Sequence, residues 1–167
     1  NPSDLLNIRG NYAKRPDLPA TPGFEGVGIV ESSGGGWRGA LLKGRRVIVL
    51  NRHTGNWAEK VAISKQFVIP VSSKLTLDES ATFFVNPATA YILVRHILRI
   101  PKNQWLLQTA AASAVGKMVI RLGNYYGFHT LNVVRRHDQV QHLKKMGARH
   151  VIVFNAKHDN ERILIDQ

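Results

Sequence analysis

Residues 105–116 read WLLQTAAASAVG, and the character of the chain changes within this stretch. Its first part, residues 105–109, is an apolar run of the length expected for a buried parallel strand. Small residues follow, and apolar side chains then recur at helical spacing as far as Tyr126. Gly127 stands where a C-terminal helix cap would lie. The stretch therefore predicts a strand, a tight turn and a helix.

The alternation of strand and helix continues downstream. Residues 130–134 form a second predicted strand, and residues 150–154 form a third. The helix between them has apolar residues at helical spacing and ends at Gly147. Such alternation implies a parallel sheet with right-handed crossovers, so we predict a βαβαβ unit. Residues 155–167 predict one more helix.

The turn after the first strand has the small residues that a dinucleotide site needs. Ala111, Ser113 and Gly116 stand where such sites usually carry Gly-x-Gly-x-x-Gly. Small side chains let the backbone approach a pyrophosphate, whose charge then meets the helix N-terminus at Ala114 and Val115. Small residues at a strand-to-helix turn are also typical of tight packing alone. By itself the turn leaves both interpretations open.

The end of the second strand favours a phosphorylated cofactor. Arg135 and Arg136 follow the strand directly, where the ribose edge of a dinucleotide would lie. A carboxylate at this place selects the free 2′-hydroxyl of NAD, whereas arginine accommodates the 2′-phosphate of NADP. We therefore predict NADP, with Arg135 as the first candidate for the phosphate. The alternative is a solvated arginine pair on a basic protein.

The first part of the chain has a different texture. Up to about residue 73, short runs rich in Val and Ile are separated by Gly and Pro, a pattern typical of β-structure. We predict strands at residues 27–31, 46–50, 60–64 and 67–71.

A helical period replaces this texture from residue 77. The helical stretch begins at Asp78, is interrupted at Asn86-Pro87, and resumes over residues 90–98. The β texture has ended well before residue 101, where the alternation of strand and helix begins. We predict a first domain over residues 1–100 and a nucleotide-binding domain over residues 101–167.

The composition excludes several classes of protein. The chain has 23 Lys and Arg against 11 Asp and Glu, a formal net charge of +12, and its 44% apolar content is enough for a folded core. The absence of cysteine excludes disulfides, cysteine nucleophiles and thiolate metal sites. No apolar run reaches the roughly 18 residues of a membrane span, so we expect no membrane partner. Because the basic residues are scattered, we expect a phosphorylated small molecule rather than nucleic acid as the partner.

Several motifs in order resemble the medium-chain dehydrogenase/reductase superfamily. They are NPSDLLNIRGNY, PATPGFEGVGIV, NPATAY, QTAAASAVG and NVVRR. Within it the chain most resembles the trans-2-enoyl-thioester reductases, which reduce enoyl-CoA or enoyl-acyl-carrier-protein substrates in fatty acid metabolism. The neighbouring NADPH:quinone oxidoreductases share NPSD and the Gly-x-Tyr element but usually differ at NPATAY. The resemblance implies a GroES-like β-barrel catalytic domain followed by a Rossmann NADP-binding domain.

The resemblance also implies a zinc-free enzyme. Zinc-dependent members carry a catalytic His where this chain has Phe24, in Gly23-Phe24-Glu25. The chain also lacks the cysteines of both zinc sites in those members. We therefore expect no metal, and the seven histidines show no paired ligand spacing.

Two aromatic residues become candidate catalytic residues through the resemblance. Tyr12 matches the tyrosine that lies beside the nicotinamide in enoyl reductases. As hydride adds to the β-carbon of an unsaturated thioester, a hydroxyl there can stabilise the enolate oxygen or protonate the α-carbon. Trp57 matches an aromatic residue at the cleft. The alternatives are a Tyr12 packed on a strand and a Trp57 packed in the core.

Four polar residues match elements around the cofactor. Asn1 and Asp4 match the element near the nicotinamide, and we assign Asn1 to the catalytic set. Asn86 and Thr89 match the element that runs under the cofactor and are predicted to bind it.

Three functional hypotheses follow. The first is an NADPH-dependent reductase of an activated carbon–carbon double bond in an enoyl thioester. The second keeps the fold and replaces the substrate with a quinone. The third is a non-catalytic basic binding module, whose binding to polyanions would be sensitive to salt.

The resemblance also bears on the length of the protein and its setting. Members of the superfamily are about twice as long, so we expect this chain to be a fragment with an incomplete barrel, half of a Rossmann domain and little or no activity alone. We expect the intact protein to be a homodimer. Its predicted location is the cytoplasm, with the mitochondrial matrix as the alternative.

Overall fold

The computed structural model describes residues 1–12, 17–51 and 55–155. The chain divides into two compact units, Asn1–Val85 and Asn86–Gln167, and each is described by itself.

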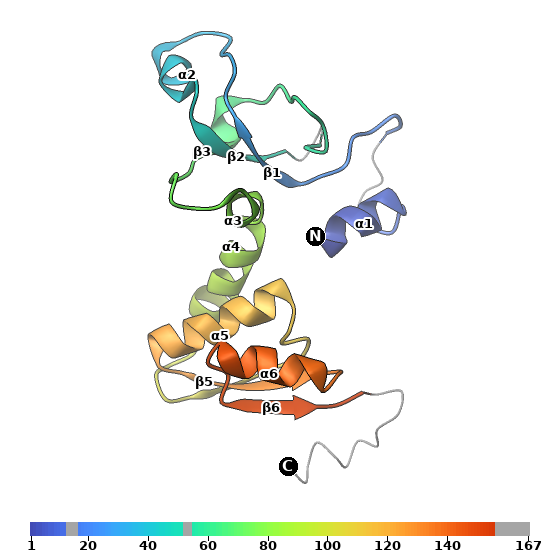
Figure 1. The fold of residues 1–167 in the computed structure, drawn as a ribbon, viewed down its shortest axis with the longest axis vertical. Helices are drawn as coiled ribbons and strands as arrows, with labels where there is room; N and C mark the ends of the chain where they lie inside the picture. The colour runs from blue at the N-terminus through green and yellow to red at the C-terminus, as the bar shows by residue number, and fades with distance from the viewer. Residues whose placement is uncertain (13–16, 52–54, 156–167) are drawn as a thin grey trace. The chain divides into compact units, whose positions relative to one another are not determined.

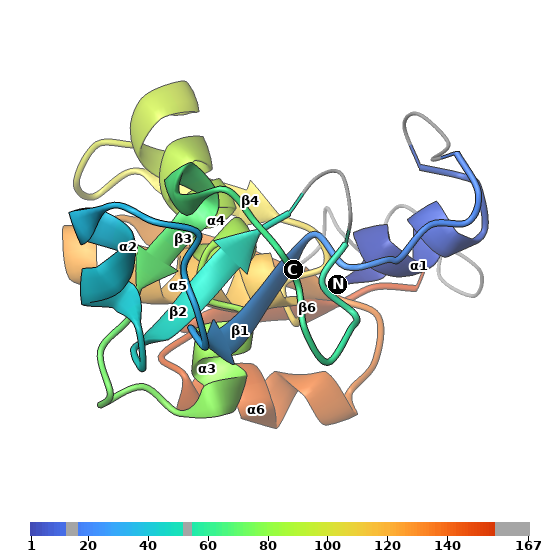
Figure 2. The same cartoon turned by 90° about the horizontal axis from the view of Figure 1, so that it is seen from above.

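The first unit is built around a three-stranded antiparallel sheet. Its elements are α1 (Pro2–Ile8), β1 (Glu25–Ile29), α2 (Trp37–Leu42), β2 (Arg46–Leu50), the 3₁₀ turn η1 (Lys65–Phe67), β3 (Val68–Pro70) and α3 (Leu77–Ala81). The strand order is β1-β2-β3, and Figure 2 shows the three strands side by side. Ile48 of the central strand pairs with Val27 on one side and Ile69 on the other.

The central strand β2 is the core of this unit. Val47, Ile48 and Val49 are all buried, so β2 is covered on both faces and needs no polar alternation. Helix α3 packs against β1 and β2. It begins with a capping box in which Thr76 Oγ1 accepts from the Glu79 amide at 3.1 Å and Glu79 Oε2 accepts from the Thr76 amide at 2.9 Å.

The predicted strand at residues 60–64 is wrong. The structure has no strand there, and Val61 is exposed. The alternating β-branched residues of this segment lack a neighbouring strand among the described residues, and pattern alone cannot supply one. The next strand, β3, begins at Val68 after the turn η1 and is shorter than predicted.

Two helices occur in the region predicted as β-structure. Helix α1 has Asn1 as its N-cap residue, Pro2 in its first turn and Asp4 beside the first-turn amides. These are ordinary signals of a helix start. Helix α2 begins directly after the glycines at 34–36, within a stretch whose Gly and Pro residues predict only breaks between strands.

The second unit contains the predicted βαβαβ unit. Its elements are α4 (Val85–Tyr91), which starts at the boundary, the π-helical segment η2 (Ile92–Ile97), β4 (Trp105–Gln108), α5 (Ala114–Tyr126), β5 (His129–Val134), α6 (Asp138–Lys145) and β6 (His150–Val153). The strands are parallel in the order β4-β5-β6, with Leu131 paired to both Leu107 and His150. Figure 1 shows α5 and α6 on the same side of this sheet, as right-handed crossovers require.

Two apolar clusters hold this unit together. One joins α4, η2 and α5 around Val94, Val119 and Phe128. The other joins α5, α6 and the sheet around Ile120 and Leu143. The predicted cap Gly127 ends α5 in the left-handed conformation, with φ of 78°.

The helical stretch before the sheet differs from its prediction. The break lies at residues 82–84, and Pro87 falls in the first turn of α4, where its missing N–H costs no helical hydrogen bond. The resumed helix is π-helical over η2, with the Leu98 amide donating to the Leu93 carbonyl at 2.8 Å. The helix predicted over residues 155–167 lies almost entirely outside the described residues.

Candidate functional site

The turn between β4 and α5 is held tightly against the sheet. Ala110 adopts a positive φ of 50°, which is uncommon for a residue with a side chain. Ala111 is fully buried, and its amide donates to the Val133 carbonyl of β5 at 3.2 Å. The turn is therefore hydrogen-bonded to β5 just beyond the paired part of β4.

The turn presents a helix N-terminus to solvent. Ser113 is the N-cap residue of the 13-residue α5, and its Oγ accepts from the Gly116 amide at 3.1 Å. Ser113 and Ala114 are exposed, and Val115 is half-buried. The first amides of a helix have no intrahelical acceptor and carry the positive end of its dipole. This end of α5 can therefore receive an anion such as a pyrophosphate.

Gly116 is required for packing. A Cβ atom at this position would lie 2.5 Å from the Ala111 carbonyl oxygen, so any side chain would collide with the turn. This close contact between Gly116 and Ala111 explains the small residues of the turn by packing alone. Their role in cofactor binding stays a prediction, and the two interpretations are compatible because close packing also bares the backbone to a ligand.

The structure distinguishes the two arginines after β5. Both are exposed, but Arg136 Nε lies 3.1 Å from Asp138 Oδ1 in an ion pair. Among the described residues, Arg135 forms no ion pair. Arg135 is therefore the better candidate for a phosphate. Asp138 is the nearest acidic residue along the chain and is paired with Arg136.

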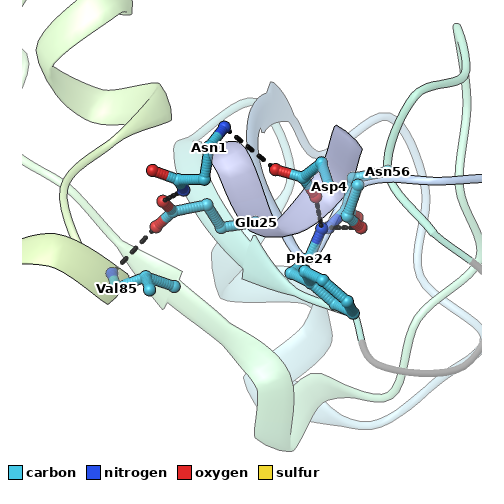
Figure 3. Close-up of polar contacts among 7 residues, drawn as sticks. Asn1, Asp4, Phe24, Glu25, Asn56 and Val85 are labelled. Atoms are coloured by element: carbon cyan, nitrogen blue, oxygen red, sulfur yellow. Dashed lines mark hydrogen bonds and ion pairs between the residues drawn. The ribbon is translucent and has the colours of Figure 1, made fainter. Parts of the chain in front are cut away.

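A polar cluster in the first unit links α1 to β1 and to the start of α4 (Figure 3). Glu25 accepts from Asn1 Nδ2 at 2.7 Å with one carboxylate oxygen and from the Val85 amide at 2.9 Å with the other. Asp4, which is buried, accepts from the Phe24 amide at 2.9 Å, and its other oxygen lies 3.0 Å from the Asn1 backbone nitrogen. The cluster fixes the predicted site residue Asn1 against the loop before β1.

The two predicted aromatic residues lie against the same loop. The ring of Tyr12 is 5.5 Å from that of Phe24, and the side chain is 40% exposed. Trp57 packs its indole on Gly23, where a Cβ atom would collide with the ring, and is 53% exposed. The Trp57 amide donates to the Pro22 carbonyl at 2.9 Å. Trp57 is therefore not packed in a core, which was the alternative to its site role, and Tyr12 packs on the ring of Phe24. The catalytic roles of both residues stay predictions.

Asn86 and Thr89 share one face of α4, three residues apart. Asn86 is half-buried and Thr89 is exposed. Their predicted contact with a cofactor stays a prediction.

The first unit also contains a hollow of about 830 Å³ between β1, β2 and residues 58–65. Tyr12, Asn1 and Trp57 are not among its lining residues. The predicted catalytic residues therefore gather outside this hollow, around the loop at Gly23 and Phe24.

Three polar residues of these regions were missed by sequence reasoning. Glu25 organises the cluster around Asn1, while Gln108 and Asn132 form hydrogen bonds between the sheet and the first turn of α5. A signal for the last two was present, because an amide side chain inside an apolar parallel strand needs a hydrogen-bond partner.

The described residues contain neither a metal-binding cluster nor a membrane-spanning helix. No group of three or more His, Asp or Glu in the described ranges is placed to hold a metal ion. Within the same ranges, no helix has the length and apolar content that a membrane span requires.

These features resemble those of known proteins. Residues 1–73 match the alcohol dehydrogenase GroES-like domain. The chain is 38% identical over 156 residues to the mitochondrial enoyl-[acyl-carrier-protein] reductase of Homo sapiens, covering 91% of this chain and 42% of that protein. The resemblance to the medium-chain dehydrogenase/reductase superfamily is confirmed.

Solved structures of this superfamily support the whole fold. A candidate NADPH:quinone reductase from Bacillus thuringiensis superposes with a TM-score of 0.84 and 36% identity, over 96% of this chain and 47% of that one. The quinone oxidoreductase of Escherichia coli complexed with NADPH superposes with a TM-score of 0.79 and 26% identity, over 96% of this chain and 48% of that one. The predicted fold class, a GroES-like domain followed by a partial Rossmann unit, is confirmed. The chain spans less than half the length of these superfamily members.

Proposed function

We propose that this chain is part of an NADPH-dependent reductase that acts on an activated carbon–carbon double bond in an enoyl thioester. The observation that carries the proposal is the exposed N-terminus of α5 together with the exposed Arg135 after β5. The first suits a pyrophosphate and the second suits a 2′-phosphate. Both follow neighbouring strands, β4 and β5, at their carboxyl ends, where dinucleotides bind in open parallel sheets.

The relatives support the cofactor and the substrate class. The E. coli quinone oxidoreductase was solved with NADPH, and the human relative is named for the reduction of enoyl groups on acyl-carrier protein. The residues of the turn fit such a cofactor, since the buried Ala111 and the glycine at 116 keep the backbone bare. Bound NADPH would supply the hydride for reduction.

The first unit supplies the polar groups that we propose for the substrate. Tyr12 is exposed, so its hydroxyl can donate a hydrogen bond to a carbonyl oxygen on which negative charge builds. Asn1 is held beside the same loop, with its Nδ2 directed to Glu25. Trp57 offers an exposed aromatic face for packing against an acyl chain or a ring.

A quinone substrate is the second candidate. It is favoured by the solved structures, since the B. thuringiensis and E. coli proteins are both named for quinones. The sequence NPATAY and the enoyl reductase relative favour the thioester. Assay of an intact reductase that contains this sequence, with crotonyl-CoA against a benzoquinone, separates the two candidates.

The cofactor proposal can be tested on the chain itself. Calorimetry with NADPH and NADH at two salt concentrations should show a preference for NADPH, and Arg135→Ala should weaken NADPH binding by about tenfold and leave NADH binding unchanged. Arg149→Ala removes another exposed arginine, directly before β6, and is the control. Equal, strongly salt-dependent binding of both nucleotides would support the basic binding module instead.

We further propose that the isolated chain has little turnover and that the intact enzyme is a homodimer. The human relative is named as mitochondrial, which supports a mitochondrial location in preference to the cytoplasm. Turnover by the purified chain, or a monomeric intact enzyme in sedimentation, would contradict these two proposals.

A further inference from the structure

Two side-chain amides connect the sheet to the first turn of α5. Gln108, the last residue of β4, donates through Nε2 to the Gly116 carbonyl at 3.1 Å and to Asn132 Oδ1 at 2.7 Å. Gly116 is the third residue of α5, and its own amide is bonded to the N-cap side chain. Gly116 is therefore bonded through both backbone groups. Its carbonyl accepts from Gln108 of the sheet, and its amide donates to the N-cap residue Ser113.

Asn132 extends this connection across the sheet. Its side chain is fully buried, and Nδ2 donates to the His150 carbonyl of β6 at 2.8 Å and to Thr130 Oγ1 at 3.0 Å. Because Nδ2 faces these oxygens, Oδ1 must face Gln108, so the orientation of both amides is determined. The hydrogen bonds run from β6 through β5 and β4 to the first turn of α5.

A packing role alone does not explain these residues. Buried positions of parallel strands are usually apolar. A buried amide adds little net stability when all its hydrogen bonds are formed, and it destabilises the fold when one of them is missing. What such a network of hydrogen-bonded amides, with the fully buried Asn132 at its centre, does supply is a single arrangement of the groups it joins. Here one end of the network is the first turn of α5, whose backbone amides lie at the exposed N-terminus of the helix.

We propose that Gln108 and Asn132 are positioning residues that hold the first turn of α5 in the orientation that receives the pyrophosphate of the cofactor. This inference rests on the proposed NADPH site and deepens it. Neither residue touches the cofactor. They act through the Gly116 carbonyl, which sets the direction of the N-terminal amides of the helix.

The experiment compares two ligands. NADPH contains the pyrophosphate, whereas adenosine 2′-monophosphate contains only the adenosine and the 2′-phosphate that Arg135 would bind. Gln108→Met keeps the length of the side chain and removes both hydrogen bonds. We expect NADPH to bind about tenfold more weakly, by calorimetry, and adenosine 2′-monophosphate to bind as before, by NMR titration.

A second readout needs no ligand. Hydrogen exchange of the Gly116 and Lys117 amides, which are bonded to Ser113 in the folded chain, should become about tenfold faster in Gln108→Met. Exchange in β6 should not change. Gln141→Met, an exposed glutamine on α6, is the control and should alter neither binding nor exchange.

The outcomes separate this inference from the proposed function. If Gln108→Met leaves the exchange of Gly116 and Lys117 unchanged, or weakens both ligands equally, the positioning role is overturned whatever the cofactor is. If the parent chain shows no preference for NADPH over NADH, the proposed cofactor fails, and the exchange experiment still decides whether Gln108 orders the turn. If Asn132→Asp folds, it should repeat the loss of NADPH binding, because a carboxylate oxygen would face the carbonyl of His150.

Discussion

The two units of this protein build their candidate sites by different means. In the second unit the site is mainly backbone: a helix N-terminus, a buried alanine and a glycine, ordered by hydrogen bonds from the sheet. In the first unit the site is mainly side chains, and two carboxylates, Asp4 and Glu25, hold α1 against the loop before β1. A backbone site follows from a regular fold, whereas a side-chain site depends on particular long-range partners.

The largest loss of stability should come from adding a side chain at Gly116, in the site of the second unit that is built mainly from backbone. Gly116→Ala places a Cβ atom against the Ala111 carbonyl, at 2.5 Å in the present geometry. We expect the free energy of unfolding to fall by about 3 kcal/mol, since the colliding atoms are backbone on both sides. Urea unfolding measures this. Gly28→Ala, where a Cβ atom meets nothing within 4 Å, is the control.

The side-chain site should respond next. Glu25→Ala removes both acceptors of the cluster and leaves the Val85 amide and Asn1 Nδ2 without them. We expect a loss of about 2 kcal/mol in the free energy of unfolding, because hydrogen bonds to a charged group are among the stronger ones. Glu59→Ala, at an exposed position, is the comparison. An equal loss in both variants would mean that the cluster in Figure 3 contributes nothing specific.

Removal of the helix cap should have a smaller effect. Ser113→Ala removes the acceptor of the Gly116 amide, and an N-cap of this kind contributes about 1 kcal/mol. Ser64 is a matched control, because it is the N-cap residue of η1 and forms no side-chain cap bond. Ser64→Ala should therefore leave the unfolding midpoint unchanged. A similar loss in both variants would show that the α5 cap is unimportant.

The smallest expected effect distinguishes the two arginines. Arg136 is paired with Asp138 on the surface, so Arg136→Ala should weaken NADPH binding by only about twofold, against about tenfold for Arg135→Ala. Calorimetry at a single salt concentration compares them. A larger loss at Arg136 would reverse the assignment of the 2′-phosphate and would imply that the ion pair with Asp138 opens when the cofactor binds.

The sequence also predicts the two units with different accuracy. The strands and helices of the βαβαβ unit, from β4 to β6, were predicted within a few residues, because apolar periodicity and terminal glycines such as Gly127 and Gly147 are local signals. In the first unit, residues 60–64 have the composition of a strand but form none, and α1 was missed although Asn1 and Pro2 mark a helix start. Strand formation there depends on which neighbours are available to pair.

The sequence by itself determined the βαβαβ order, the small-residue turn and the arginine pair that follows β5, because each depends on residues close together in the chain. Only the tertiary structure decided that Arg136 pairs with Asp138, that Glu25 links Asn1 to Val85, and that Gln108 and Asn132 connect the sheet to α5. Apolar periodicity reports which face of an element is buried. It does not report which distant donor meets which acceptor, since that pairing exists only once the elements have packed.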